Sequence, residues 1–323
     1  MKLLVRVRAT VGQALERVER LLEEVLSATE GLGATTSLHL LRAGGKRIRP
    51  LLTLLSARIF GGRDDDVVPI AAAAEMIHMA TLVHDDVIDH APTRRGRPTV
   101  NAIWGNYPAV LTGDFMLARA MSLIVDQGNP RVLKIMSDMI YEMCEGEIAQ
   151  HQFKGRLDQT QQDYFRRIGK KTARFFQACC ESGAILGGAS SHHVQAMGVF
   201  GYQLGMAFQV VDDLLDVVGD EVEMGKPAGS DLAEGVFTLP VLYLLEQPAY
   251  RERVAELLRE FPPAGAAIRQ VLRMVRDNGA VRYTEEVARR FIDQALAALG
   301  QVPDGVASRL LRDITLELAA RRT

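Results

Sequence analysis

The segment Leu82-Val83-His84-Asp85-Asp86-Val87-Ile88-Asp89 is acidic, yet it ends an alanine-rich run that starts at Ile70 and has no Gly or Pro before residue 91. Residues four apart share one face of a helix, so Asp85 and Asp89 stack, whereas Asp86 lies about 100° further round. Because three carboxylates crowded at one helix end repel one another, a cation must offset them, and Mg²⁺ takes oxygen ligands of this kind. The segment therefore predicts a long helix over 70–91 whose acidic end binds Mg²⁺.

The same spacing of aspartates recurs in Val210-Val211-Asp212-Asp213-Leu214-Leu215-Asp216, which also ends a long apolar helix. One such cluster could be a solvated helix end, because short patterns of this kind arise by chance. Two matched clusters, each after a helix with almost no charge, are hard to explain as surface decoration. If the clusters face each other, they form a site in which several metal ions hold one diphosphate.

The composition is that of an ordinary globular protein, with 48% hydrophobic and 24% charged residues in a chain of 323. The formal net charge of −2 and the aromatic content of 6% argue against a nucleic-acid surface and against base-stacking platforms. No Ser/Pro-rich stretch or charge block marks a linker, so we expect one domain over residues 1–323. The cysteines form no metal-ligand pattern and the N-terminus lacks the apolar core of a signal peptide, which favours a cytoplasmic protein.

The stretch from Ser182 to Val211 contains no Asp, Glu, Lys or Arg, so a membrane-spanning helix has to be considered. Gly187-Gly188 and a Ser-Ser-His-His segment interrupt this stretch, and two aspartates follow its end. A helix that is buried on all sides in a helical core has the same composition. We therefore expect no transmembrane segment.

Apolar residues recur with helical spacing along the chain, and no window shows the sustained alternation of a strand. We therefore predict an all-α fold of ten or more helices. The helices are expected at 11–26, from 38 to the Gly44-Gly45 break, 51–60, 70–91, 100–125 with interruptions near 105 and 108, 129–153, 158–170, 172–186, a helix ending at 216, 238–245, and three or four over 249–322. Residues 92–99 are expected to form a basic turn, and residues 219–234 a polar loop.

A diphosphate site also needs cations from the protein, and four short segments offer them. Gly44-Gly45-Lys46-Arg47-Ile48-Arg49-Pro50 has three basic residues around a turn, where glycine lets the backbone approach a phosphate and arginine offers bidentate donors. Residues 92–99 carry three arginines, which could pair with the nearby aspartates or bridge a bound anion. Lys170-Lys171-Thr172 lies at a predicted helix junction, and a helix N-terminus is an anion site. Gly225-Lys226-Pro227 follows the second acidic cluster.

Together these segments resemble the trans-type isoprenyl diphosphate synthases, or polyprenyl synthetases, in order and spacing. The likeness covers about residues 38–245 and is strongest to long-chain members such as the catalytic component of heptaprenyl diphosphate synthases, as in Glu75-Met76-Ile77-His78-Met79-Ala80-Thr81-Leu82-Val83-His84. The matching stretches are residues 44–50, 82–89, 94–99, Gly113-Asp114, Lys171-Thr172, 208–216 and 225–232.

The resemblance implies the isoprenoid synthase fold, a helical bundle around a central cavity, assembled as a homodimer or as a heterodimer with a small regulatory subunit. It implies repeated condensation of isopentenyl diphosphate onto an allylic diphosphate, with two or three Mg²⁺ ions per active site. Metal ions and protein cations neutralise the leaving pyrophosphate, so the allylic C–O bond ionises and the double bond of isopentenyl diphosphate attacks the cation. The proton is then lost to the pyrophosphate, since no side-chain base is evident.

The resemblance also assigns roles to individual residues. The catalytic set is Asp85, Asp86, Asp89, Asp212, Asp213 and Asp216, with Asp85, Asp89 and Asp212 as metal ligands. Isopentenyl diphosphate is held by Lys46, Arg49, His78 and Arg95. The allylic diphosphate is held by Arg94, Lys171, Thr172, Gln209 and Lys226. Two positions depart from many relatives, because His90 replaces an acid and Val236 replaces a lysine, so one phosphate contact is expected to be missing at Val236.

By resemblance, the product is an all-trans polyprenyl diphosphate of about seven units that serves as a quinone side chain. The growing tail would run from the acidic cluster along the first acidic helix, past Ile77, Ala80 and Thr81, each helical turn adding about 5.4 Å. Ala80 and Thr81 are small, whereas short-chain relatives have an aromatic residue at one or both places. Small residues could instead serve only close helix packing.

Other functions remain open at this stage. A shorter-chain farnesyl or geranylgeranyl synthase would carry the same motifs. A terpene cyclase also ionises allylic diphosphates, but it needs neither the Gly-Gly-Lys loop nor a second Asp-Asp-x-x-Asp segment. A non-catalytic regulatory subunit should have lost acidic ligands, and all six aspartates are present. The region after Leu245 receives no role from the sequence.

Overall fold

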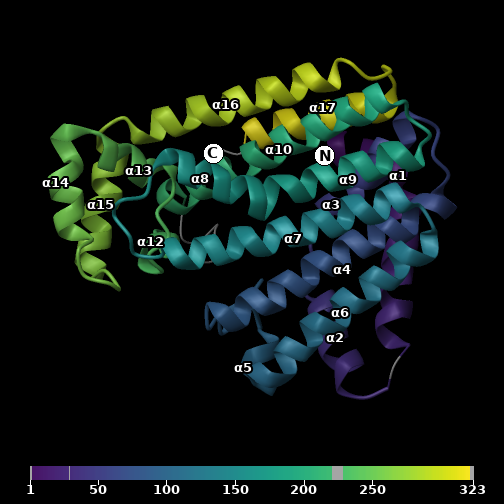
Figure 1. Cartoon of the computed structure of the whole chain (residues 1–323), viewed down its shortest axis with the longest axis horizontal. Coiled ribbons are helices and arrows are strands. Elements are labelled where there is room, and N and C mark those ends of the chain that lie inside the picture. The colour runs from purple at the N-terminus through teal and green to yellow at the C-terminus, as the bar shows by residue number, and fades with distance from the viewer. Residues whose placement is uncertain (1, 29, 220–227, 321–323) are drawn as a thin grey trace. The chain divides into compact units, whose positions relative to one another are not determined.

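The computed structural model describes residues 2–28, 30–219 and 228–320, and within these ranges the chain is almost entirely helical (Figure 1). More than ten helices lie in the described part, which confirms the predicted all-α fold. The chain divides into two compact units, and each unit is described by itself. Unit 1 contains residues 1–136, 179–197 and 302–311, and unit 2 contains residues 137–178, 198–301 and 312–323. The prediction of one domain over 1–323 stays a prediction.

Unit 1 is organised around helix α4, which packs against α1, α3 and, along most of its length, α6 (Figure 1). The alanines of α4 from Ala71 to Ala74 are fully buried, so neighbouring helices approach its backbone closely. The elements that lie wholly in this unit are α1 (Lys2–Ser27), α2 (Leu32–Arg42), α3 (Ile48–Ile59), α4 (Asp64–Ile88), β1 (Thr93–Arg94), β2 (Arg97–Pro98), α5 (Val100–Trp104) and α6 (Asn106–Gln127).

Helix α4 begins at Asp64, six residues earlier than the predicted start at Ile70. Pro69 lies inside the helix, where a proline removes one backbone hydrogen bond. The missed signal is Asp64-Asp65-Asp66 in the first turn, since acidic side chains there interact favourably with the helix dipole. The helix ends at Ile88 with Asp89 as its C-cap, so the first acidic cluster lies in the last turn.

The predicted basic turn after α4 is instead a minimal hairpin, in which Thr93 pairs with Pro98 and Arg94 with Arg97. Its two central residues, Arg95 and Gly96, have φ values of 52° and 72°. Two successive left-handed residues are typical of the two-residue turns whose twist matches that of antiparallel strands. The hairpin is therefore set by local backbone geometry and holds Arg94 and Arg95 in a defined place next to the end of α4.

Helix α6 comes very close to α4 beside the first acidic cluster. A Cβ atom on Gly113 would clash with His84 Nε2, so only glycine fits at this point of α6. The same His84 nitrogen is 3.1 Å from the carbonyl oxygen of Val110 and 3.5 Å from a carboxylate oxygen of Asp114. The Gly-Asp pair noted in the sequence thus packs against the residue that precedes Asp85.

Unit 2 has its core between α8, α10, α13, α15 and α16, where Tyr164 and Phe237 are among the largest buried side chains. The three or four helices predicted after residue 249 are four in the described chain, with breaks at the expected prolines and glycines. Helices α7 (Pro130–Phe153), α9 (Arg174–Leu186), α10 (Ser191–Val218) and α17 (Val306–Ala319) contribute residues to both units. The others are α8 (Gln161–Ile168), the π-helical turn η1 (Gly169–Ala173), α12 (Ser230–Ala233), α13 (Leu239–Glu246), α14 (Pro248–Leu257), α15 (Gly265–Asp277) and α16 (Ala280–Leu299).

Among the described residues, two helices are long and apolar enough to span a membrane by length and composition, α4 and α6. Most of the apolar stretch of α4 is buried (72%), as in the core helix of a globular protein. The corresponding stretch of α6 is only 33% buried, so this helix carries apolar side chains that the described residues of unit 1 leave uncovered. The uncharged stretch 182–211 is divided between α9 and α10, as its central glycines predicted.

Candidate active site

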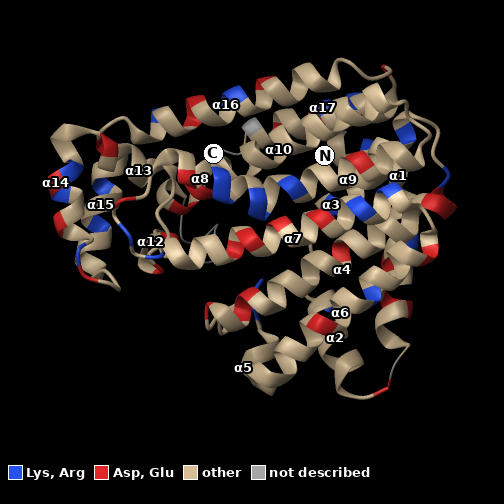
Figure 2. Ribbon diagram, in the orientation of Figure 1, with Lys and Arg blue, Asp and Glu red and all other residues tan. Residues whose placement is uncertain are grey.

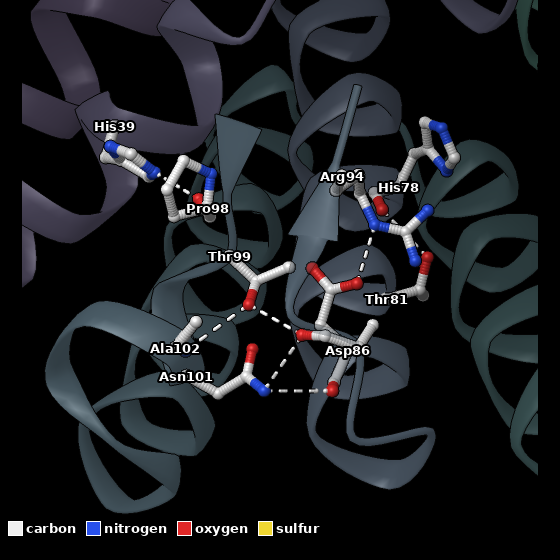
Figure 3. A network of polar contacts seen from close by, with 10 residues as sticks. His39, His78, Thr81, Asp86, Arg94, Pro98, Thr99, Asn101 and Ala102 are labelled. Atoms are coloured by element: carbon white, nitrogen blue, oxygen red, sulfur yellow. Dashed lines mark hydrogen bonds and ion pairs between the residues drawn. The ribbon is translucent and has the colours of Figure 1, made fainter. Parts of the chain in front are cut away.

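The first acidic cluster separates into an inner and an outer part. Asp86 is 2% exposed, and its carboxylate accepts a hydrogen bond of 2.7 Å from Arg94 Nε in the hairpin (Figure 3). Burial raises the pKa of Asp86, although the adjacent Arg94 guanidinium opposes this rise. Asp85 is half-buried and Asp89 is exposed. The cluster therefore offers Asp85 and Asp89 to solvent while Asp86 is held by the protein.

A short polar network fixes the end of α4 to the following helix (Figure 3). The side-chain amide of Asn101 donates to the carbonyl oxygens of Asp86, at 3.1 Å, and Ala91, at 3.3 Å. The Thr99 hydroxyl donates to the same Ala91 carbonyl at 2.7 Å. The Asp86 carbonyl also accepts the backbone N–H of Ala91 at 2.9 Å, so these bonds join the end of α4, the residues after it and α5. The network holds the backbone that carries Asp85 and Asp89.

Unit 1 contains a group of basic side chains, which we call the basic cluster. Its members are Lys46, Arg47, Arg49 and Arg95. A Cβ atom on Gly45 would lie 2.8 Å from Arg47 Nη1 and 2.9 Å from Arg95 Nη1, so two guanidinium groups lie beside one glycine. Partial loss of water around each guanidinium lowers the pKa of Arg49 and of Arg95, and Glu75 opposes both shifts. Like charges collected at one place are suited to an anion with several negative charges, such as a diphosphate.

His78 lies within reach of this basic cluster. Burial is the main cause of a pKa well below the usual value of 6.5, and the charges of Arg49, Arg95, Arg94 and Arg47 add to it. The imidazole is therefore neutral at physiological pH and can donate a hydrogen bond without adding a charge. Its role in binding isopentenyl diphosphate stays a prediction.

Three non-glycine residues of the described chain have a left-handed backbone, namely Arg47, His90 and Arg95, with φ values of 49°, 52° and 52°. Arg47 precedes α3, His90 follows the first acidic cluster, and Arg95 forms the hairpin turn. Such conformations persist where surrounding contacts hold them, and they gather at functional sites. Each of the three lies next to predicted site residues: Arg47 is near Lys46 and Arg49, His90 follows Asp89, and Arg95 follows Arg94.

The second acidic cluster, in unit 2, shows the same division. Asp212 is exposed, whereas Asp213 and Asp216 are buried. Asp213 accepts hydrogen bonds from the Tyr164 hydroxyl at 2.7 Å and from the Gln209 amide at 2.8 Å. Burial raises the pKa of Asp213 to about 6, although these two hydrogen bonds oppose the shift. Asp213 is thus an internal carboxylate whose oxygens are both engaged.

Asp216 has a comparable internal role. One carboxylate oxygen accepts the Ser230 hydroxyl at 2.6 Å, and the other accepts the backbone N–H of Asp231 at 3.3 Å. Its backbone carbonyl accepts the N–H of Gly229 at 2.8 Å. Asp216 therefore joins the end of α10 to the start of α12. Lys226, predicted to bind the allylic diphosphate, lies outside the described residues, as do Gly225 and Pro227.

The prediction of a junction between two separate helices at Lys170-Lys171-Thr172 is wrong. The backbone continues from α8 through η1 into α9 without leaving the right-handed helical region at Gly169 or Arg174, so this part of the described chain offers no helix N-terminus to an anion. A π-helical turn of this kind is rare and frequently lies at a functional site. The Thr172 hydroxyl donates to the Gln209 side-chain oxygen at 2.8 Å, which extends the network around Asp213.

The basic residues of η1 and α9 face acidic residues of α7, visible as blue and red positions on adjacent ribbons in Figure 2. Lys170 pairs with Glu145 at 2.7 Å, Lys171 with Glu147 at 2.6 Å and Arg174 with Glu142 at 2.8 Å. A Cβ atom on Gly146 would lie 2.9 Å from the backbone nitrogen of Lys171, so the two backbones touch here. Lys171, predicted to bind a diphosphate, is therefore paired with a carboxylate.

The residues predicted to control chain length lie on α4 in unit 1. Ile77 and Ala80 are buried, and Thr81 is half-buried with its hydroxyl donating to the His78 carbonyl at 2.8 Å. Tyr164, Glu147 and Asn101 were not foreseen as members of the two sites. Tyr164 contacts a residue 49 positions away, and no local pattern marks such a pairing.

The donor set fits a hard divalent cation. Within the described ranges, no group of three or more His, Cys, Asp and Glu side chains is arranged to hold a metal ion. Mg²⁺ is usually held by one or two carboxylates together with water and substrate phosphates. The half-buried Asp85 and the exposed Asp89 of unit 1 suit that mode, and so does the exposed Asp212 of unit 2, each unit taken by itself. The inner carboxylates Asp86, Asp213 and Asp216 are occupied by protein donors.

Replacing His78 by Gln should change how stability depends on pH. The pKa of His78 is lower in the folded chain than the ordinary 6.5, so below about pH 6.5 the unfolded chain binds a proton that the native chain does not. Native stability therefore falls as the pH drops through 6.5 toward the folded pKa, and His78→Gln removes this loss. Urea unfolding midpoints between pH 7.5 and 5 measure it, with exposed His151→Gln as control. Parallel pH profiles for wild type and His78→Gln would contradict the assignment.

Comparison with known proteins places these features in a family. A relative from Geobacillus stearothermophilus, named heptaprenyl diphosphate synthase component 2, is 43% identical over 308 residues, covering 95% of each chain. A relative from Methanothermobacter thermautotrophicus, named short chain isoprenyl diphosphate synthase, is 36% identical and covers 93% of this chain and 94% of the relative.

Solved structures agree with this. A heptaprenyl diphosphate synthase from Staphylococcus aureus is similar with a TM-score of 0.91 at 34% identity, covering 97% of this chain and 99% of that one. A polyprenyl synthase from Caulobacter crescentus, complexed with calcium and isoprenyl diphosphate, has a TM-score of 0.92 at 34% identity and 98% coverage of both chains. The family model for polyprenyl synthetase matches residues 33–275. The chain therefore belongs to the polyprenyl synthetase family.

Proposed function

We propose that the chain is a prenyltransferase that condenses isopentenyl diphosphate repeatedly onto an allylic diphosphate to make a long all-trans polyprenyl diphosphate. The observation that carries this proposal is that the aspartates of each cluster differ in burial: some are exposed or half-buried, and the others are buried and bound by protein donors. In a chain of this family, each helix end offers outward carboxylates for a metal–diphosphate complex and keeps inner carboxylates bound to the protein. The relatives named as heptaprenyl diphosphate synthases support the long product.

Asp85, Asp89 and Asp212 would bind Mg²⁺ together with the allylic diphosphate. The bound metal supplies charge neutralisation for the leaving pyrophosphate. A related structure named as complexed with calcium and isoprenyl diphosphate supports a divalent cation at such a site. Asp86, Asp213 and Asp216 would act by position, because each holds a neighbouring group in place: Arg94, Gln209 and Ser230 respectively.

The basic cluster would bind the diphosphate of isopentenyl diphosphate through Lys46, Arg49, His78 and Arg95. Arg49 and Arg95 would provide guanidinium donors to the diphosphate, whose negative charge offsets theirs. Neutral His78 adds a hydrogen bond at low electrostatic cost.

The allylic diphosphate would be bound by Arg94, Lys171, Thr172, Gln209 and Lys226. Arg94 pairs with Asp86 and Lys171 pairs with Glu147. Because these carboxylates already order both side chains, less side-chain entropy would be lost when the diphosphate binds.

The chemistry follows from this arrangement. The allylic C–O bond breaks and its electron pair leaves with pyrophosphate, whose charge the cations offset. The double bond of isopentenyl diphosphate then forms a C–C bond with the allylic carbon, and a proton passes to pyrophosphate. Buried apolar side chains along α4 would keep water from the allylic cation.

One alternative has specific support. A shorter product is compatible with the relative that is named a short-chain synthase at 36% identity. A cytoplasmic location and a role of the product as a quinone side chain are proposed from the resemblance, and free Cys144, Cys179 and Cys180 are consistent with a reducing compartment. A terpene cyclase is disfavoured by the basic loop and the second acidic cluster.

Replacing Asp85 by Ala should leave the fold intact and lower turnover at least about 100-fold, because one outward carboxylate for the metal–diphosphate complex is lost. Steady-state incorporation of labelled isopentenyl diphosphate, with varied Mg²⁺, measures the loss. Asp126→Ala, at an exposed position of α6 in the same unit, is the control. Near-normal turnover of Asp85→Ala would show that this aspartate is not a metal ligand.

Replacing Ala80 by Phe should shorten the product from about seven prenyl units to about three or four, because a ring one turn or so before Asp85 blocks a tail that advances about 5.4 Å per helical turn. The first condensation should continue. Chromatography of the dephosphorylated products measures the length, and Ile88→Phe places the same ring at an exposed position of α4. Unchanged length in Ala80→Phe would remove this face of α4 from the tail path.

The exposed apolar side chains Ile103, Tyr107, Val110 and Leu111 of α5 and α6 would form the surface for a second chain, either another copy or a small partner subunit. If the chain forms a homodimer, we expect light scattering to give a mass above the 35.5 kDa monomer. Activity that appears only after a second protein is added would select the heterodimer. Leu111→Asp should reduce the assembly, whereas Leu316→Asp, at a similarly exposed leucine of α17, should not. A fully active monomer would refute this proposal.

A further inference from the structure

Glu75 is a buried carboxylate that the proposed reaction does not use. It lies on α4 with 2% of its surface exposed, and its Oε1 atom is 3.0 Å from Arg47 Nη1. The same guanidinium is held from the other side by Glu19 of α1, which accepts hydrogen bonds from Arg47 Nε and, at 3.1 Å, from Nη2. Arg47 is therefore bracketed by two carboxylates from two helices.

Glu19 and Glu75 offset part of the positive charge of the basic cluster. Burial lowers the pKa of Arg47, but hydrogen bonds and charges from Glu19 and Glu75 outweigh it, so the pKa is raised. Glu75 also acts on Arg49 and Arg95, whose charges it partly offsets. Arg47 is thus committed to carboxylates, whereas Arg95 lies exposed at the hairpin turn.

The backbone conformation of Arg47 also depends on the contacts around it. Arg47 precedes α3 with φ 49° and ψ 38°, a left-handed conformation that a non-glycine residue keeps only where its surroundings hold it. Its side chain does not cap this end of α3. Arg47 Nη1 also donates to the Gly44 carbonyl oxygen at 3.3 Å, so the arginine that the two carboxylates hold is bonded directly to the loop of Gly44 to Lys46. Glu19 lies before residue 33, outside the part of the chain that the family model matches.

We propose that Glu19 and Glu75 are positioning residues for isopentenyl diphosphate, acting through Arg47 to hold the loop that carries Lys46 and leads into Arg49. This inference rests on the proposed function for the identity of the anion. It gives the N-terminal helix α1 a part in substrate binding that its sequence did not suggest. Arg47 itself would be a structural arginine within a cluster whose other cations contact substrate.

The test compares Glu19→Gln and Glu75→Gln with Asp65→Asn. Asp65 pairs with Arg17 at 2.6 Å and so also links α4 to α1, but away from Arg47. The KM for isopentenyl diphosphate should rise about tenfold in each glutamate variant, a loss of about 1.4 kcal/mol. The KM for the allylic diphosphate and kcat should stay within about twofold, and Asp65→Asn should change none of these values. Glu19 is 45% exposed, so its variant stays informative if Glu75→Gln does not fold.

A double-variant cycle tests whether Arg47 transmits the effect. In an Arg47→Gln background, which should itself raise the same KM, Glu19→Gln should add nothing further. An unchanged KM for isopentenyl diphosphate in folded Glu19→Gln, an equal rise in Asp65→Asn, or additive effects in the double variant would each overturn the proposal.

A binding measurement separates this inference from the proposed function. Calorimetric titration with inorganic pyrophosphate, without allylic substrate, should give about tenfold weaker binding in Glu19→Gln than in wild type. If the wild type elongates isopentenyl diphosphate but Glu19→Gln binds pyrophosphate normally, the inference is wrong and the function stands. If the wild type forms no prenyl product, the function is wrong, and weaker pyrophosphate binding in Glu19→Gln would still support the positioning role.

Discussion

A buried carboxylate needs hydrogen-bond donors for its oxygens in place of water, and this constraint organises both acidic clusters. Asp86, Asp213 and Asp216 are buried, and each is bound by a donor from a different element: Arg94, Tyr164 and Ser230. These bonds fix the helix ends, the hairpin and the start of α12 relative to the clusters that they belong to. The less buried aspartates owe their position to the inner ones. The proposed metal–diphosphate site would need no preformed cage, because these inner carboxylates hold the surrounding elements in place.

In the basic cluster the signs are reversed, because carboxylates hold a positively charged side chain in place. Guanidinium groups beside Gly45 repel one another, and carboxylates on two helices hold one of them, Arg47. The remaining repulsion and the left-handed backbones at Arg47 and Arg95 are costs that the fold bears without substrate. Such costs are compatible with stability because α4 and its neighbours are closely packed around buried alanines. Packing of the apolar core thus supports a polar region that would not hold its shape alone.

Much of this could be predicted from the sequence, because the decisive signals are local. Asn129-Pro130 marks the start of α7, and the glycines at 187 and 188 separate α9 from α10. The spacing of the aspartates identified both clusters. Two predictions at helix boundaries were wrong: α4 begins before Ile70, with Asp64-Asp65-Asp66 in its first turn, and the helical backbone continues through residues 170–172. Contacts between distant positions, such as Tyr164 with Asp213 or Glu19 with Arg47, leave no trace in a single sequence, so the inner partners of the site were missed.

The π-helical turn at Gly169–Ala173 has a consequence for how this segment can change in evolution. Tyr164 and Thr172 both reach α10, at Asp213 and Gln209, which lie four residues apart on one face. In a regular α-helix, residues eight apart point about 80° away from each other, so both contacts could not be made. The wider turn reduces that offset and brings Thr172 onto the face of Tyr164. Deleting a single residue here would conserve every side chain of the site yet rotate one half of it away, so the length of this segment is constrained as strictly as its composition.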